Sequence, residues 1–430
     1  MINRIFNFQF SIFNLRFSGK EIVKNPLFSG SAIMIVGSNV ANFFAYIYHL
    51  ILGRILGPSS YSELATLISI LGLMGVVSSS FYLVIVKFVS SAKKNERKAM
   101  LSWLSKKGFI LGVSVLLVFS ALVPFLSSSL QIDSKTLFLV GPIFLVSTLA
   151  FINKSFLLGL LKFEKFIGTA LSEAFLKLIL GLLFVYLGLS VFGATLGMFL
   201  AFAAGWVISR FFLKEFLGGK ERNFKKSRQL FIYSIPIIFQ TVAVTSLYST
   251  DIILVKHFFP PYEAGLYASL STLGRIIFFG AAPVSTVMFP MISRRYAKGE
   301  NYRKIFIYSL LLTMLIASGV LLIYSLFPEF SIKILFGTAY LEAAPLLFWF
   351  GVFMALFTLS SLFISYFLSI EKTKVVVFPL IAAAAQVVGI WFWHDTILSV
   401  IKVSIFSTSF LIASLLLYFG HESRRAKQKA

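Results

Sequence analysis

Four charged side chains lie within long stretches of the sequence that are otherwise apolar. Arg275 lies near the centre of the apolar run 264–292, and Lys177, Glu173 and Asp251 lie within two other runs. A charge at the centre of a bilayer costs at least about 2.5 kcal/mol, so each needs a partner or a function. Arg275 and Lys177 predict binding of an anionic group such as a diphosphate, which arginine holds through paired hydrogen bonds. Asp251 and Glu173 are candidates to carry H⁺ or Na⁺ as a coupling ion.

Polar side chains recur at helical spacing in three of the apolar runs, and each set shares one face of a predicted helix. The three sets are Ser31, Ser38, Asn42, Tyr46 and His49; Gln240, Val244, Tyr248 and Asp251; and Tyr267, Ser271, Arg275, Phe278, Ala282 and Ser285. Such faces should avoid lipid, so we predict that they line an aqueous cavity. The candidate substrate-binding residues are Arg275, Arg54, Lys177, Asn42, Tyr46, His49, Ser271, Gln240 and Tyr248.

The same residues also have structural explanations. Arg275 could form an internal ion pair with Asp251, and Glu173 could pair with Lys177, four residues later on the same helical face. His49 could be a hydrogen-bonding group where helices meet, and the polar face around it could join neighbouring helices. The sequence leaves these alternatives open.

Several classes of chemistry have no matching residues. There is no Cys, and the four His have no metal-binding spacing. The three Asp form no DxD pair, and neither GxxxxGK[ST] nor GxSxG occurs. We therefore predict a transporter rather than an enzyme, with no catalytic residue, cofactor or metal site.

The composition indicates a membrane protein of many helices. Hydrophobic residues make up 58% of the 430 residues, charged residues only 13%, and the mean hydropathy is +0.91. A water-soluble protein, including a basic nucleic-acid binder, is about one quarter charged. Apolar runs of about 20 residues or more predict an all-α polytopic fold of twelve transmembrane helices. They are residues 28–52, 63–89, 109–127, 137–161, 167–188, 191–213, 230–258, 264–292, 305–327, 343–370, 375–393 and 396–419.

Basic residues alternate between the loops that join these helices. If the N-terminus is cytoplasmic, 31 of the 39 Lys and Arg fall in cytoplasmic segments and four in external ones, Arg54, Lys135, Lys256 and Lys333. Membrane proteins retain basic loops in the cytoplasm. The alternation predicts a multi-pass protein of the cell membrane with both termini cytoplasmic. The external loops are short, and the longest is residues 328–342.

The chain has the layout of an internal repeat. At an offset of 203 residues, Pro58 aligns with Pro261 and Ser90 with Ser293, and both copies run helix, outer turn, helix, basic loop. We predict two six-helix lobes related by a pseudo-two-fold axis along the membrane normal, an arrangement that suits alternating access. The predicted segments are a cytoplasmic or interfacial lead (1–27), the lobes (28–213 and 230–419), a basic linker (214–229) and a basic tail (420–430).

Several motifs resemble one known family. The stretch Gly53-Arg-Ile-Leu-Gly-Pro-Ser-Ser-Tyr61 is similar to the turn after the first helix of polysaccharide flippases. Asp251, Ala264-Gly-Leu-Tyr-Ala268 and Phe289-Pro-Met-Ile-Ser293 resemble the seventh and eighth helices of that family, and Leu335-Phe-Gly-Thr-Ala-Tyr340 its turn before helix 10. The resemblance extends over nearly the whole chain. This family belongs to the multidrug/oligosaccharidyl-lipid/polysaccharide flippase superfamily.

The resemblance implies a flippase that moves polyprenyl-diphosphate-linked oligosaccharide from the inner to the outer leaflet. Arg275 and Arg54 would then attract the diphosphate, while the lipid tail stays in the bilayer and passes between the lobes. The implied partners are the lipid-linked oligosaccharide, membrane lipids and H⁺ or Na⁺, and the protein would act as a monomer. A multidrug/cation antiporter coupled through Asp251 is the alternative. A membrane glycan polymerase or ligase fits less well, because the external loops are short.

Overall fold

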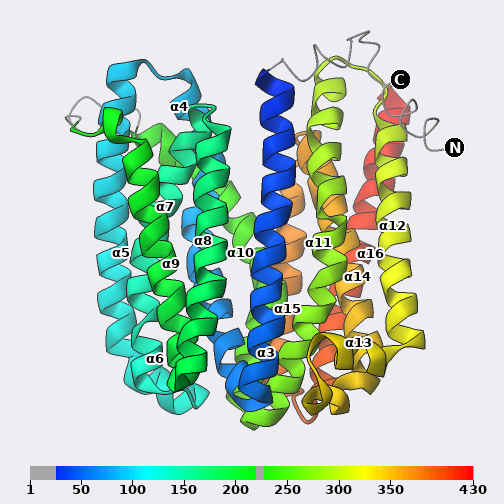
Figure 1. Ribbon diagram of the computed structural model, residues 1–430. Helices are drawn as coiled ribbons and strands as arrows, with labels where there is room; N and C mark the ends of the chain where they lie inside the picture. Colours follow the sequence, from blue (N-terminus) through cyan, green and yellow to red (C-terminus); the bar gives the residue numbers. More distant parts are fainter. Residues whose placement is uncertain (1–25, 219–226, 430) are drawn as a thin grey trace, which may run out of the picture.

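The computed structural model describes residues 26–218 and 227–429, and every regular element in these residues is helical (Figure 1). The long helices are α3 (Pro26–Ser80), α5 (Lys94–Leu130), α7 (Val140–Gly159), α8 (Phe163–Phe184), α9 (Ser190–Phe212), α10 (Ser227–Phe258), α11 (Pro261–Ala297), α12 (Arg303–Leu326), α14 (Ala344–Ser369), α15 (Val377–Phe392) and α16 (Ile397–Lys429). The short elements are α4 (Tyr82–Ser91), α6 (Ser134–Phe138), α13 (Pro328–Leu335), the π-helix η1 (Val185–Leu189), and the 3₁₀ turns η2 (Lys214–Phe216), η4 (Thr338–Ala343) and η5 (Thr373–Val376).

Two predicted helix pairs are joined by turns so tight that the helical pattern barely breaks. Within α3, Gly57 has φ of 70°, and Pro58 follows it without a backbone N–H to continue the ladder. In Figure 1 α3 descends and the chain then turns back upward. Between α8 and α9, Gly188 has φ of 86° at the end of η1, and these two helices pack side by side. Both turns need the left-handed backbone that glycine adopts without strain.

Ten helical segments in the described residues are long and apolar enough to cross a membrane. Two of them, Val36–Ser90 and Phe163–Phe212, are 55 and 50 residues long, because each contains one of the glycine turns. An all-α membrane protein of many passes is therefore confirmed. The second predicted helix differs in detail, because α3 ends at Ser80 and α4 begins at Tyr82.

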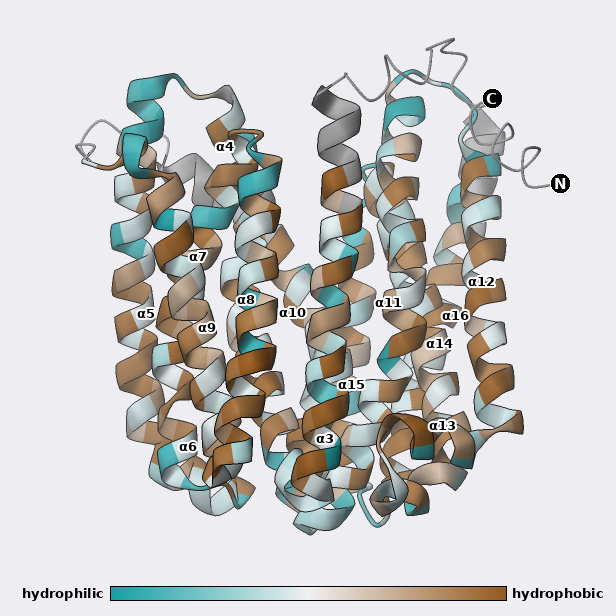
Figure 2. Ribbon diagram, in the orientation of Figure 1, coloured by the Kyte–Doolittle hydropathy of each residue, from teal (hydrophilic) through white to brown (hydrophobic). Residues whose placement is uncertain are grey.

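Polar residues gather at one end of the molecule. In Figure 2 hydrophilic residues gather mainly at the end where α3 begins and α16 ends, and apolar residues cover the middle. We call this end the basic end, and the end with α6 and α13 the opposite end. Many large apolar side chains on the middle band are exposed, as expected of a surface that faces lipid; examples are Leu117, Val118, Leu315 and Leu417.

Helix α3 occupies a central position. It packs against α8, α10, α11 and α7, and Figure 1 shows it between the helices labelled α8 and α11. The main hydrophobic core runs through these helices and α14, whereas a smaller core at the basic end joins α4, α5, α7 and η2. Phe216 of η2 is buried in that smaller core, so the predicted linker begins as an ordered element. Most of the predicted lead and residues 219–226 of the linker lie outside the described residues, and α16 continues into the predicted tail.

Candidate functional site

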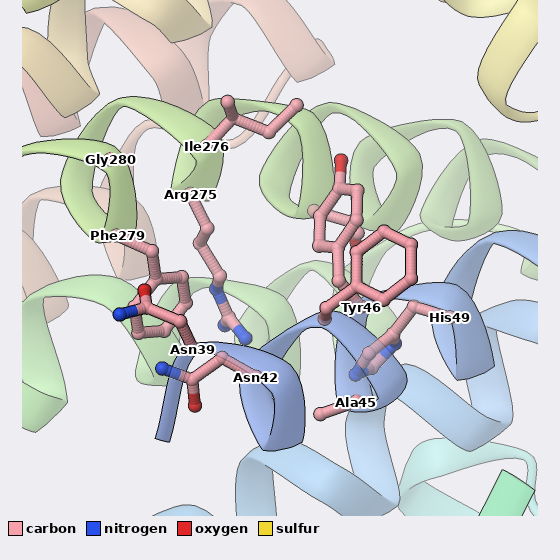
Figure 3. Close-up of a pocket in the computed structure, with 11 residues that line it drawn as sticks. Asn39, Asn42, Ala45, Tyr46, His49, Arg275, Ile276, Phe279 and Gly280 are labelled. Carbon is pink, nitrogen blue, oxygen red and sulfur yellow. The ribbon is translucent and has the colours of Figure 1, made fainter. Parts of the chain in front are cut away.

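The main candidate site is a cavity of about 430 Å³ between α3 and α11. Figure 3 shows side chains from the two helices converging on it. Its lining residues are Asn39, Asn42, Phe43, Ala45, Tyr46 and His49 of α3, and Thr272, Arg275, Ile276, Phe279 and Gly280 of α11. Among these eleven described residues none is acidic, and Arg275 carries the only permanent charge. The cavity is therefore cationic and rich in uncharged hydrogen-bonding groups.

Arg275 is held in place but retains unused donors. Its Nη2 donates to the backbone carbonyl of Tyr248 at 2.8 Å, and its guanidinium lies 5.3 Å from the centre of the Tyr248 ring. Its Nε is buried without a hydrogen-bond partner. No carboxylate of the described residues lies within ion-pair distance, so the ion pair with Asp251 is not formed. A guanidinium fixed by a carbonyl and a ring, with its charge unpaired, is suited to an anion.

A hydrogen-bonded chain joins the two helices behind the cavity. His49 Nδ1 lies 3.1 Å from the hydroxyl of Tyr61, which lies 2.8 Å from the hydroxyl of Thr272. The hydroxyl of Tyr46 is buried without a partner. His49 thus combines both of its predicted roles, since it lines the cavity and also joins neighbouring segments.

The rim of the cavity is apolar. Phe43 of α3 is 59% exposed and Phe279 of α11 is 51% exposed, and both line the cavity. These two exposed rings give the cavity an apolar part that is open to the surroundings of the protein. A ligand with a charged head and an apolar tail fits such an opening.

The polar faces predicted on α10 and α11 meet at a second, smaller cavity of about 240 Å³. Gln240 and Val244 of α10 line it together with Phe278, Ala282 and Ser285 of α11, as the helical spacing predicted. Residues of α14, which sequence reasoning did not select, complete the wall. They are Ser361, Ile364 and Ser365.

Lys177 and Glu173 lie away from both cavities. Glu173 pairs with Lys154 of α7 rather than with Lys177, so the predicted pairing is wrong. The Glu173 side chain packs against Gly205 of α9, where a Cβ atom would clash with it, and this contact turns it toward α7. The Lys177 ammonium lies 4.6 Å from the centre of the Tyr48 ring, as a cation–π contact. Neither residue lines the cavity at Arg275.

Asp251 and Ser271 are buried in the packing between α10 and α11. The hydroxyl of Tyr267 donates to Asp251 Oδ2 at 2.7 Å, whereas Asp251 Oδ1 has no partner. Asp251 is 1% exposed and Ser271 is 2% exposed. Ser271 therefore does not line a cavity, and Asp251 keeps one free acceptor that a cation could use.

Arg54 lies at the opposite end, outside both cavities, so its predicted place in the cavity is wrong. Its guanidinium donates to the backbone carbonyls of Lys333, Ile334 and Leu335, at the end of α13. Sequence spacing could not reveal this contact, because its partners are backbone groups some 280 residues away. Lys256, in the last turn of α10, is 1% exposed and donates to Ser62 at 3.0 Å.

Asn39 and Thr272 are cavity residues that sequence reasoning missed. Both lie three residues before a predicted member, Asn42 and Arg275 respectively, so helical spacing carried the signal. Phe43 and Phe279 gave no signal, because apolar residues in an apolar run are common. The side chain of Ser31 lies outside the described residues.

Comparison with known proteins agrees with this fold. Residues 27–296, more than half of the chain, match the family described as Polysaccharide biosynthesis protein. The uncharacterized membrane protein MJ1375 of Methanocaldococcus jannaschii is 26% identical over 366 residues, covering 79% of this chain and 83% of that protein.

Two solved structures have the same architecture. An inward-facing multidrug resistance MATE family transporter of the MOP superfamily gives a TM-score of 0.73 at 14% identity, with 91% of this chain and 96% of that chain covered. The lipid II flippase MurJ, in an inward closed conformation, gives a TM-score of 0.71 at 15% identity, with 90% of this chain and 87% of that chain covered. At these identities the likeness shows the fold. The chain belongs to the family described as Polysaccharide biosynthesis protein.

Proposed function

We propose that this protein moves polyprenyl-diphosphate-linked oligosaccharide from the inner to the outer leaflet of the cell membrane. The observation that carries the proposal is the cavity between α3 and α11. Its one permanent charge is the unpaired Arg275, and its rim has exposed phenylalanines. A diphosphate would occupy the cavity and bind the free guanidinium donors, while the polyprenyl tail stays in the lipid. No cofactor is needed for this task.

The proposed topology has twelve crossings in two six-helix lobes. The glycine turns at Gly57 and Gly188 divide the two longest segments, which turns ten segments into twelve. Pro58 and Pro261, aligned at an offset of 203 residues, each follow a turn and begin a helical stretch. The lobes would be residues 28–213 and 230–419, and the basic end, with both termini, would face the cytoplasm. We propose that a monomer is the working unit.

The proposed mechanism is alternating access, with this structure open toward the cytoplasm. Support comes from the opposite end, where contacts between the proposed lobes close the external side. Gly265 lies so close to Pro58 that a Cβ atom on it would fall 2.0 Å from the Pro58 carbonyl oxygen. The hydroxyl of Tyr340 donates to the Gly53 carbonyl at 2.7 Å. These contacts would break when the external side opens.

Arg275 provides the test. We expect Arg275→Gln to reduce transfer of a labelled polyprenyl-diphosphate oligosaccharide about 10- to 100-fold in proteoliposomes, because a hydrogen bond to a charged group is worth about 1.5–3 kcal/mol. The matched control is Lys402→Gln, which removes an exposed charge from α16 and should leave transfer unchanged. Equal transfer by wild type and Arg275→Gln would remove the cavity from the mechanism.

A multidrug/cation antiporter is the second candidate, and Asp251 favours it. The free Asp251 Oδ1, buried between α10 and α11, could accept H⁺ or Na⁺. Cells that overproduce such an antiporter should resist cationic drugs, and Asp251→Asn should abolish that resistance. The same variant tests ion coupling in a flippase, since transfer driven by an ion gradient would then no longer respond to the gradient. Glu173 is the weaker coupling candidate, because Lys154 already neutralises it.

A further inference from the structure

The second cavity is lined by polar side chains without charge. Five of its nine lining residues carry hydroxyl or amide groups, and none of these described residues is ionisable; the five are Gln240, Ser285, Thr286, Ser361 and Ser365. The remaining wall includes the ring of Phe278. A wall of this kind offers donors and acceptors to a neutral ligand and no charge to an ion.

Most of these polar groups are not used within the protein. The hydroxyl of Ser361 is buried without a partner. Gln240, Ser285 and Ser365 make no side-chain hydrogen bond to any other described residue, whereas Thr286 donates to Ala282 at 3.0 Å and still offers its lone pairs. Buried polar groups are nearly always satisfied in folded proteins. The buried hydroxyl of Ser361 therefore lacks a partner that a ligand in the cavity could supply, and the half-exposed Gln240, Ser285 and Ser365 beside it are open to the same ligand.

Tyr248 and Phe278 link the lining of the first cavity to that of the second. Tyr248 holds Arg275 through its carbonyl and ring, and it also stacks on Phe278 with ring centres 6.0 Å apart. Phe278 in turn lines the second cavity. Along α11 the linings of the two cavities overlap, since Phe278 lines the second and Phe279 and Gly280 line the first. Arg275 and Ser285 are ten residues apart on α11, which corresponds to a rise of about 15 Å along the helix.

We infer that the second cavity binds the sugar attached to the diphosphate of the transported lipid. This inference rests on the proposed function, because it takes the diphosphate at Arg275 as the point of attachment. A sugar ring presents hydroxyl groups in several directions and a C–H face that packs on an aromatic ring. The hydroxyl and amide groups of the cavity can hydrogen-bond to the sugar hydroxyls, and the ring of Phe278 can pack on the C–H face. The site recognises an uncharged, hydroxyl-rich ring next to the phosphate.

Binding to protein in lipid nanodiscs tests the inference, with farnesyl diphosphate and its conjugates to glucose, galactose and N-acetylglucosamine as probes. At least one conjugate should bind about fivefold more tightly than farnesyl diphosphate, the change expected for one net neutral hydrogen bond. The double variant Gln240→Leu with Ser285→Val should remove that gain and leave farnesyl diphosphate binding unchanged. The matched control Ser114→Val, at an exposed serine of α5, should keep the gain.

Three results would overturn the inference. The first is that none of the three conjugates binds more tightly than farnesyl diphosphate. The second is that the double variant weakens binding of farnesyl diphosphate and of the conjugates equally. The third is that methyl glycosides bind at a site where they do not compete with the conjugates. The proposed function has its own readout in the same experiment, because Arg275→Gln should weaken farnesyl diphosphate itself. If it does not, the diphosphate assignment fails while the sugar gain is still measured.

Discussion

Three charged side chains in the membrane-spanning helices are satisfied in three different ways. Glu173 is neutralised by Lys154, Lys177 lies over the ring of Tyr48, and Arg275 is held by Tyr248. Only Arg275 combines an unpaired charge with a cavity. The first two therefore have structural roles, and a ligand site is expected only at the third.

The pair formed by Lys154 and Glu173 makes a prediction for stability. Both side chains are largely buried, with 16% and 8% of each exposed, so removing one partner leaves an unpaired charge. Lys154→Met should destabilise the protein by about 3–5 kcal/mol. The double variant Lys154→Met with Glu173→Gln should recover part of that loss, because no charge is then left buried. Thermal unfolding in detergent measures both.

Lys177→Met is the control, since Lys177 contacts a ring and not the carboxylate. Lys177→Met should lower the stability of the protein clearly less than Lys154→Met does. The reverse order would mean that Glu173 pairs with Lys177, four residues along the same helix, as the sequence predicted.

Helical spacing selected Asn42, Tyr46, His49 and Arg275, and all four line one cavity. It also suggested Lys177 as the partner of Glu173, which pairs with Lys154 instead. Arg54 was expected in the cavity from its charge and from the family resemblance, and it binds backbone carbonyls. Spacing defines which face of a helix a side chain occupies. It contains no information about the neighbouring helix, so Lys154 of α7 could not be chosen over Lys177. It also cannot identify backbone carbonyls as partners, and those are what Arg54 binds.

At the scale of elements, the contact between Arg54 and α13 joins the ends of two helical segments. The last carbonyls of a helix lack intrahelical partners and carry partial negative charge, so a guanidinium stabilises them. Here the helix end lies in the proposed C-terminal lobe, and Arg54 follows the first helix of the proposed N-terminal lobe. The contact therefore joins the two proposed lobes at the opposite end of the molecule. We call this contact between Arg54 and the last carbonyls of α13 the latch.

Loss of this latch should open the external side more often. The chain has no cysteine, so a single introduced thiol reports without interference. Ser62→Cys is a suitable reporter, because Ser62 is 1% exposed and receives a hydrogen bond from Lys256 of α10. Adding Arg54→Ala should increase its labelling by a membrane-impermeant maleimide severalfold. Unchanged labelling would show that Arg54 does not hold the two segments together.

The long helices themselves were predictable, and the small elements were not. Apolar runs located α10, α12, α14 and α15 to within a few residues, because a run of about 20 apolar residues has one stable form in lipid. The predicted loop 328–342 instead contains α13 and η4, in which about half of the residues are apolar. A single turn of mixed polarity gives too weak a periodic signal to be separated from a loop.

At the scale of the whole molecule, several contacts at the opposite end join residues far apart in the sequence. Tyr61 contacts the rings of Phe336 and Tyr340, and Gly53 lies against Phe336 with a hydrogen bond from Tyr340. In the proposed mechanism, substrate bound at Arg275 would not leave toward this end while these contacts persist. If the two lobes rock about the cavity, the contacts must break in every transport cycle.

A reversible cross-link at this end tests that requirement. A Cβ atom at position 53 would lie 2.7 Å from the ring of Phe336, so cysteines in Gly53→Cys with Phe336→Cys are within reach of a short thiol cross-linker. Cross-linking should reduce transfer of lipid-linked oligosaccharide at least tenfold, and a reducible linker should allow reductant to restore it. The controls are Phe336→Cys alone and Gly53→Cys combined with Phe336→Ala, which removes the ring that a Cβ atom at position 53 would meet. Both should keep their activity after the same treatment. Full transfer by the cross-linked protein would mean that the external side need not open between α3 and α13, and that the substrate crosses without the lobes separating there.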